Sequence, residues 1–317
     1  MISCTEFIPM YSEFFKFLEK KGGGYDAVLK YWYHISDTSL GDLTNPHSMA
    51  SFCEKYGGYD GAKKYWGHTT SEEACDTYSV EDPKNRYSYS EMRYCPSRAM
   101  LNSLEHIEPY ENYCEHCKII YSRVLEKYGV VYERDHSRVS EARCSSVLYE
   151  KGNKPTGNYT EPGEGRIVNE MKRDGKKYLH RDFHLLGDNA LKYCGDVFGD
   201  DAVIEFLTDY AKTFFAPQID EIKKHGMIVL KDWLDRLYRV EEASEVLHTV
   251  LVGDVLTVTI DKSPVIEYMR SLNQEPSKYY IEETRTLYKA IADECGLDFK
   301  LEYYNEDGAA KFVFKKK

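Results

Sequence analysis

The sequence has no long hydrophobic run, no excess of basic charge and no basic segment at its start. No uninterrupted apolar stretch approaches the ~20 residues that a transmembrane helix needs, so we expect no membrane association. Its 42 Lys and Arg residues are outnumbered by 53 Asp and Glu residues, giving a net charge of −11 that argues against nucleic acid as a partner. The first residues, MISCTEFIPMYSEFF, lack the basic region of a signal peptide, and we expect a cytoplasmic protein.

The chain is rich in two residue types that carry chemistry. It contains nine cysteines, an odd number for a disulfide framework. In a cytoplasmic protein we expect these as free thiols, metal ligands or catalytic groups. It also contains 28 tyrosines against 13 phenylalanines. A tyrosine joins a large apolar body to a hydroxyl group, which suits pockets with polar edges.

An internal repeat is the strongest signal in the sequence. A shift of 167 to 168 residues superposes CPSRAMLNSLEHIEPYENY, from Cys95, on SPVIEYMRSLNQEPSKYY, from Ser263. The identical pairs include Pro96 and Pro264, Tyr121 and Tyr288, and Gly129 and Gly296. The segment 151–165, KGNKPTGNYTEPGEG, is typical of a linker. We therefore predict two homologous halves, 1–150 and 166–317, with a linker at 151–165.

The pattern within each half predicts an α+β fold. Amphipathic helices are followed by one strand (YSYSEMRYC or DVLTVTID), a helix that begins at proline, a long helix followed by glycine, and two strands. The last two strands of the second half are joined around NEDG, which favours a hairpin. We expect a tandem duplication of a domain in which helices pack on one face of a small antiparallel sheet.

Four cysteines of the first half have no cysteine counterpart in the second half. Cys95, Cys114, Cys117 and Cys144 correspond to Ser263, Ile281, Thr284 and Phe312. Cys114 and Cys117 fall on an apolar stripe of helical spacing, so simple packing is one interpretation. The exchange of all four together instead indicates a functional set. The four thiolates can hold a tetrahedral Zn²⁺, or Cys95 at a helix start can act as a nucleophile.

Two histidines form the other candidate site. His180 and His184, in HRDFH, have the spacing of one helical turn, so we expect them on one helix face. They can ligate iron or manganese with a third ligand from Glu242 or His248, or one can act as a general base. The alternative is a pair of buried, hydrogen-bonded histidines.

The cysteine motifs resemble a known family. MRYCPS, PYENYCEHC and ARC resemble the pattern of the L-2-amino-thiazoline-4-carboxylic acid hydrolase-like family, which is similar in layout to 4-vinyl-reductase-type small-molecule-binding domains. The matching residues are Cys95, Pro96, Cys114, Cys117 and Cys144. The resemblance covers about 88–150 and, without the cysteines, 255–317. It implies hydrolytic opening of a small cyclic amidine, or capture of a small hydrophobic or carboxylated ligand.

These observations lead to two function hypotheses. The first is a hydrolase or lyase that acts on a C–N bond of a small polar molecule, a cyclic amidine or a carboxylated compound, with metal assistance. Its catalytic residues would be His180, His184 and Glu242, with zinc at the cysteine set and iron or manganese at the histidine pair. The alternative is a non-catalytic small-molecule-binding protein with a structural zinc site. A homodimer is left open in both.

Overall fold

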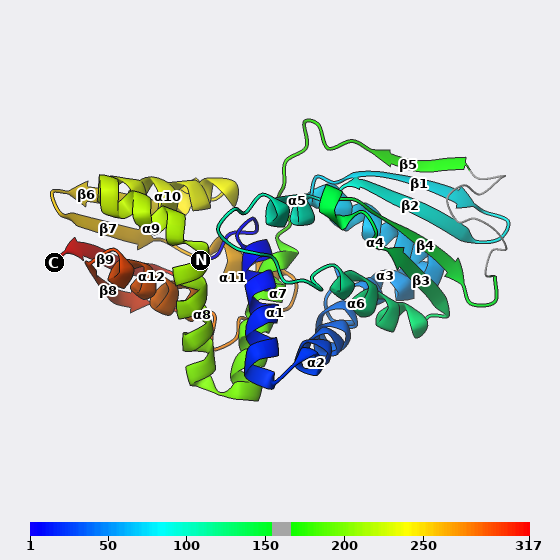
Figure 1. Cartoon of the computed structure of the whole chain (residues 1–317), viewed down its shortest axis with the longest axis horizontal. Coiled ribbons are helices and arrows are strands. Elements are labelled where there is room, and N and C mark those ends of the chain that lie inside the picture. The colour runs from blue at the N-terminus through cyan, green and yellow to red at the C-terminus, as the bar shows by residue number, and fades with distance from the viewer. Residues whose placement is uncertain (154–165) are drawn as a thin grey trace. The chain divides into compact units, whose positions relative to one another are not determined.

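The computed structural model describes residues 1–153 and 166–317, which form two compact units. Unit 1 contains Met1–Phe17 and Arg181–Lys317, and unit 2 contains Leu18–His180. Helices and two antiparallel sheets confirm the predicted α+β class (Figure 1). The boundaries of the units differ from those of the predicted halves, because residues 1–17 belong to unit 1 and residues 166–180 belong to unit 2. The two homologous halves stay a prediction. Most of the predicted linker lies outside the described residues.

Unit 2 contains a five-stranded sheet with helices packed against it. Its helices are α2 (Tyr25–Ile35), α3 (Met49–Tyr56), α4 (Gly58–Glu72), α5 (Pro96–Asn102) and α6 (Glu115–Glu126). Its strands are β1 (Asp76–Asp82), β2 (Tyr87–Tyr94), β3 (Val130–Asp135), β4 (Cys144–Glu150) and β5 (Arg166–Met171). They lie in the order β3-β4-β2-β1-β5. Helix α6 contacts β3, and α4 contacts β4.

Unit 1 contains a four-stranded sheet of order β6-β7-β9-β8. Helix α1 (Phe7–Gly22) begins in this unit. The later helices are α7 (Asp182–Phe198), α8 (Asp200–Phe214), α9 (Ala216–His225), α10 (Met227–Val240), α11 (Pro264–Ser271) and α12 (Glu282–Glu294). The strands are β6 (Leu247–Val252), β7 (Val255–Ile260), β8 (Leu297–Tyr304) and β9 (Ala310–Lys316). No helix in the described residues combines the length and the apolar character needed to span a membrane.

The two sheets share one strand order, since β3-β4-β2-β1 matches β8-β9-β7-β6. The predicted proline positions are confirmed at the starts of α5 and α11, where Cys95 and Ser263 cap the helices by accepting a backbone N–H bond. The predicted glycines that follow α6 and α12 have left-handed φ angles of 67° (Gly129) and 69° (Gly296). Strands β1 and β6 are additions, because the sequence predicted one strand where each unit has a hairpin. The duplication itself stays a prediction.

The strand registers show where the sheets differ. In unit 1, Val258 lies opposite Phe312 on the buried face, and in unit 2 the corresponding pair is Ser90 opposite Ser146. The neighbouring pair, Leu256 opposite Phe314, corresponds to Ser88 opposite Leu148. Large apolar side chains therefore fill the space under one sheet, and small hydroxyl side chains leave space under the other.

The register also corrects one sequence correspondence. Cys144 lies opposite Met92, and Met92 comes three residues before the helix cap Cys95. In the other sheet, Ala310 lies opposite Ile260, and Ile260 comes three residues before the helix cap Ser263. Cys144 therefore corresponds to Ala310 rather than to Phe312.

Two glycines of α4 test how closely α3 and α4 pack. A Cβ atom added at Gly61 would lie 2.5 Å from both Cys53 Cα and Phe52 O, whereas a Cβ atom at Gly67 would meet no atom within 4 Å. We expect Gly61→Ala to lower the free energy of unfolding by about 1–3 kcal/mol through overpacking. Gly67→Ala should raise it by up to ~1 kcal/mol, because alanine favours helix. Urea unfolding measures both, and equal effects would contradict the close packing.

Candidate functional site

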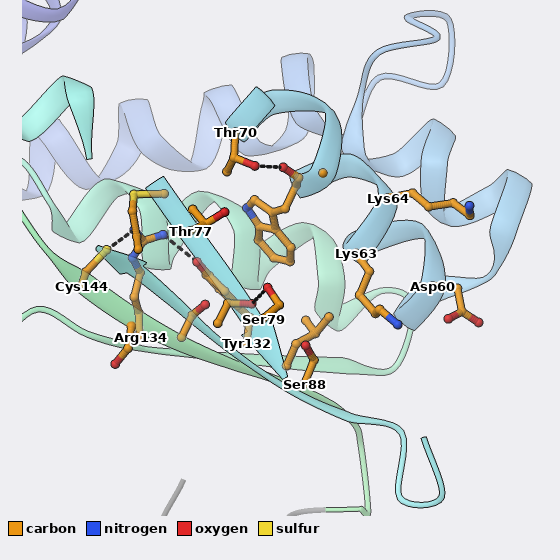
Figure 2. Close-up of a pocket in the computed structure, with 17 residues that line it drawn as sticks. Asp60, Lys63, Lys64, Thr70, Thr77, Ser79, Ser88, Tyr132, Arg134 and Cys144 are labelled. Atoms are coloured by element: carbon orange, nitrogen blue, oxygen red, sulfur yellow. Dashed lines mark hydrogen bonds between the residues drawn. The ribbon is translucent and has the colours of Figure 1, made fainter. Parts of the chain in front are cut away.

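A cavity of about 450 Å³ lies in unit 2 between α4 and the helix-facing side of the sheet (Figure 2). Hydroxyl groups from three strands line its floor. They belong to Thr77, Ser79, Ser88, Ser90, Ser145 and Ser146. Ser79 and Ser90 share a hydrogen bond of 2.7 Å between their Oγ atoms. The other sheet carries larger apolar side chains at three of these positions, where Leu256, Val258 and Phe312 correspond to Ser88, Ser90 and Ser146, so the smaller serines leave volume for the cavity.

An aromatic pair forms one wall of the cavity. The ring of Trp66, from α4, stacks on the ring of Tyr132, from β3, with centroids 4.6 Å apart and planes inclined by 26°. Stacked aromatic rings present flat apolar surface and prefer offset contact with other planar groups. The cavity therefore combines a polar floor with a flat wall.

Arg134 of β3 lies at one end of the cavity, and Lys63, Lys64 and Asp60 lie at the other (Figure 2). The Nη1 atom of Arg134 donates to Tyr132 Oη at 2.7 Å, and the Nη2 atom of Arg134 donates to Cys144 Sγ at 2.8 Å. The Nε atom is inaccessible to solvent and has no hydrogen-bond partner. No ion pair joins Arg134 to a carboxylate in the part of the chain that the structure describes.

The charge of Arg134 acts on Tyr132, on the cysteine thiols and on the buried carboxyl of Glu73, with which it forms no ion pair. Burial alone would lower its pKa, but Coulomb interactions with Tyr132 and the thiols outweigh burial and raise the pKa above its usual value. Those interactions require ionised partners, whereas burial raises the pKa of Tyr132 to about 12. An arginine without a paired anion is costly to keep away from water. An anionic ligand would supply that missing charge.

The four predicted cysteines of the site lie in unit 2 and are free thiols. All four interact electrostatically with Arg134: Cys95, Cys117 and Cys144 raise its pKa, and its charge opposes the rise in the pKa of Cys114. Burial raises the pKa of Cys95 well above its usual value and that of Cys114 to about 12. Cys95 is therefore a poor nucleophile here, because the thiolate is the reactive form.

The cysteine set does not match zinc geometry as it stands. Tetrahedral Zn²⁺ binds sulfur at ~2.3 Å, so its ligand atoms must lie within about 4 Å of one another. No three cysteine sulfurs lie within 4.8 Å of one another among residues 1–153 and 166–317. The Cys144 sulfur instead contacts a guanidinium. Zinc at Cys95, Cys114, Cys117 and Cys144 stays a prediction.

The structure separates the predicted histidine pair. Helix α7 begins at Asp182, so His184 lies in the helix and His180 precedes it; the expectation of a shared helix face is wrong. His180, in unit 2, places its Nδ1 atom 2.7 Å from Glu72 Oε2, and the backbone N–H of the neighbouring Leu179 donates to Glu72 O at 2.9 Å. These bonds hold the segment outside the helix.

His184 has its own carboxylate in unit 1. Its Nε2 atom lies 3.0 Å from Glu241 Oε2, with both side chains under 5% exposed. Glu241 also accepts the backbone N–H of Cys4 at 2.6 Å. The predicted partner Glu242 is exposed and lies 3.8 Å from Arg181. A catalytic role of His180, His184 and Glu242 stays a prediction.

Comparison with models of known families, with curated proteins and with solved structures found no match to this chain. The family resemblance stays a prediction.

Sequence reasoning missed the cavity and its arginine. The available signal was the alternation of serines in YSYSEM and CSSV, against LTVTI and KFVFK at the corresponding positions of the other half. A strand whose buried face carries serine leaves unfilled volume unless a neighbour compensates. Arg134 carried no comparable signal, because its burial depends on α4 and on strands distant in sequence.

The His184–Glu241 pair predicts a stability effect rather than a catalytic one. Burial would raise the pKa of Glu241, but the charge and hydrogen bond of His184 outweigh burial and lower it from 4.5 to about 2. The folded state thus favours the ionised carboxylate. This stabilising contribution is present above pH ~4.5 and is lost as the pH falls toward 2. His184→Ala should cost about 3–5 kcal/mol at pH 7, because it leaves a buried carboxylate unpaired.

His248→Ala is the matched control. His248 Nε2 lies 2.9 Å from Asp261 Oδ2, but both side chains are more than half exposed, so the change should cost less than about 1 kcal/mol. Urea unfolding at pH 7 compares the two variants. Equal losses would show that the buried pair contributes nothing special to the fold.

Proposed function

We propose that unit 2 binds a small carboxylated molecule in the cavity under its sheet. The observation that carries this proposal is Arg134, a cation that lines the cavity and has no carboxylate partner in the described residues. A guanidinium binds a carboxylate through parallel N–H bonds, which are among the stronger hydrogen bonds in proteins. Its unpartnered Nε–H would be one such donor.

The rest of the cavity supports a ligand that is small, planar and polar. A volume of about 450 Å³ lies within the ~300–1,000 Å³ range of small-molecule sites. The Trp66–Tyr132 wall favours a flat ring or conjugated group, and the serine floor can hydrogen-bond its polar edge. Lys64 at the far end adds positive charge in a chain of net charge −11, which favours entry of an anion, whereas Lys63 pairs with Glu81.

A hydrolytic role in the same cavity is the second candidate. Cys144 supplies a thiol that lines the cavity, and a guanidinium N–H lies 2.8 Å from its sulfur. Donors placed beside sulfur stabilise negative charge that develops there. A cyclic amidine that carries a carboxylate would place its ring near this thiol if the carboxylate bound Arg134. Cys144→Ser separates the two roles, since it should abolish turnover and leave binding in place.

Benzoate and benzamide probe the anion preference directly, because they share a planar ring and differ in charge. We expect benzoate to raise the melting temperature of the full chain and benzamide to do so much less. Arg134→Gln should weaken benzoate binding about tenfold or more, since it removes a charged hydrogen bond worth ~1.5–3 kcal/mol. Isothermal titration calorimetry measures the affinities. Equal binding of both probes would contradict the role of Arg134.

Arg93→Gln is the control for that substitution. Arg93 lies on β2 of the same sheet and pairs with Asp76 at 2.7 Å. Losing this partly exposed pair should leave benzoate affinity unchanged. An equal loss in both variants would indicate a general effect of charge.

Filling the cavity provides an independent test. Ser90→Val combined with Ser146→Phe copies the Val258 and Phe312 pair of the other sheet. We expect benzoate binding to be lost while the free energy of unfolding is maintained or raised, because apolar contacts replace empty volume. Urea unfolding confirms that the variant folds. Undiminished benzoate binding in a folded variant would place the ligand elsewhere.

A further inference from the structure

The cavity of unit 2 has a closed end and an open end. At the closed end, the Nε atom of Arg134 is inaccessible to solvent. At the opposite end, Lys64 is exposed and the side chain of Asp60 is 44% exposed (Figure 2). The cavity therefore opens to solvent between Asp60, Lys63 and Lys64, which we call the lysine end.

The charges at the lysine end do not all cancel. Lys63 pairs with Glu81. Asp60 Oδ2 lies 3.1 Å from Arg86 Nη2. Lys64 has no carboxylate partner in the part of the chain that the structure describes. One positive charge therefore remains at the open end, in addition to the charge of Arg134 at the closed end.

The strand register gives the distance between the two ends. Arg134 donates to Cys144, and Cys144 lies in one cross-strand row with Thr77, since both pair with the same residue of β2. Glu81, the partner of Lys63, comes four residues after Thr77 on β1, so the two rows are about 13 Å apart. A donor–acceptor contact of ~3 Å at each end leaves about 7 Å between the two ligand oxygens. That length suits one ring with a carboxylate on each side.

The space between the two ends is open along α4. Trp66 and Gly67 line the cavity between Lys64 and Thr70 of the same helix. A Cβ atom added at Gly67 would meet no atom within 4 Å, so no side chain blocks the path beside the indole ring. A planar group can therefore lie along Trp66 while its two edges face opposite ends of the cavity.

We propose that the ligand of this cavity is a planar dianion, with one carboxylate on Arg134 and a second anionic group on Lys64. The proposal rests on the proposed function and names the chemical class of its ligand, the dicarboxylates of about one ring in length. Lys64 is then a specificity-determining residue. An exposed charge at the rim of a site adds little affinity, but it separates ligands that differ in charge.

Terephthalate and 4-carbamoylbenzoate test the second anionic group. They share one planar shape, and an amide replaces one carboxylate in 4-carbamoylbenzoate. We expect the full chain to bind terephthalate more tightly. Lys64→Gln should lower the ratio of the two affinities about two- to fivefold, the range of an exposed ion pair. Isothermal titration calorimetry at low ionic strength, where screening is weak, measures both ligands.

The proposal is overturned if Lys64→Gln leaves that ratio unchanged. It is also overturned if terephthalate fails to bind where benzoate binds. Lys64 is exposed, so we expect the variant to fold, and circular dichroism checks this.

Lys55→Gln is the matched control. Lys55 and Lys64 contact the same ring, with Nζ atoms 5.1 Å and 4.9 Å from the Tyr56 centroid, but only Lys64 lines the cavity. We expect Lys55→Gln to leave the affinity ratio unchanged. An equal fall in both variants would indicate a general effect of surface charge and overturn the proposal.

Arg134→Gln separates failure of this inference from failure of the proposed function. We expect it to weaken both ligands, because each places a carboxylate on the guanidinium. If both ligands weaken in Arg134→Gln and Lys64→Gln has no effect on their ratio, the carboxylate site stands and the second anionic group is wrong. If a folded Arg134→Gln binds both ligands like the unchanged chain, the proposed function itself is wrong.

Discussion

The charge of Arg134 is the constraint on which the proposed function depends. Its guanidinium donates to the phenol of Tyr132, whose pKa burial raises to about 12, and to the thiol of Cys144, and its Nε–H has no partner. Burial of an unpaired cation opposes folding, so such a residue is expected where an anionic ligand completes it. The proposed roles of the serine floor and the aromatic wall depend on a ligand anion that pairs with this guanidinium.

The sheet of unit 1 serves as a comparison for the sheet of unit 2, because the two have equivalent positions with different side chains. Both have the same strand order and the same capped helices, yet one buries Val258 and Phe312 where the other carries Ser90 and Ser146. Protein interiors are close-packed, and a missing aromatic side chain leaves volume that neighbours rarely recover. One unit therefore has a filled core, while the other has a cavity lined by hydroxyl groups.

Local patterns predicted the α+β class, the proline starts and the glycine ends, because each depends on a few adjacent residues. The sequence did not predict strand β1, because DTYSVED is acidic. This segment is a strand because it forms antiparallel pairs with β2 and β5. The histidine pair was misplaced because hydrogen bonds to Glu72, more than 100 positions away, keep His180 out of the helix. Arg134 was missed for a similar reason, since only tertiary contacts place it in a cavity.

Nuclear magnetic resonance of the arginine side chains tests the central claim most directly. With ¹⁵N labelling, the Arg134 Nε–H signal is assigned by its absence in Arg134→Gln. The account predicts that benzoate shifts this signal and slows its exchange with water, whereas benzamide does neither. An Arg134 signal that is unchanged by benzoate at saturating concentration would contradict it.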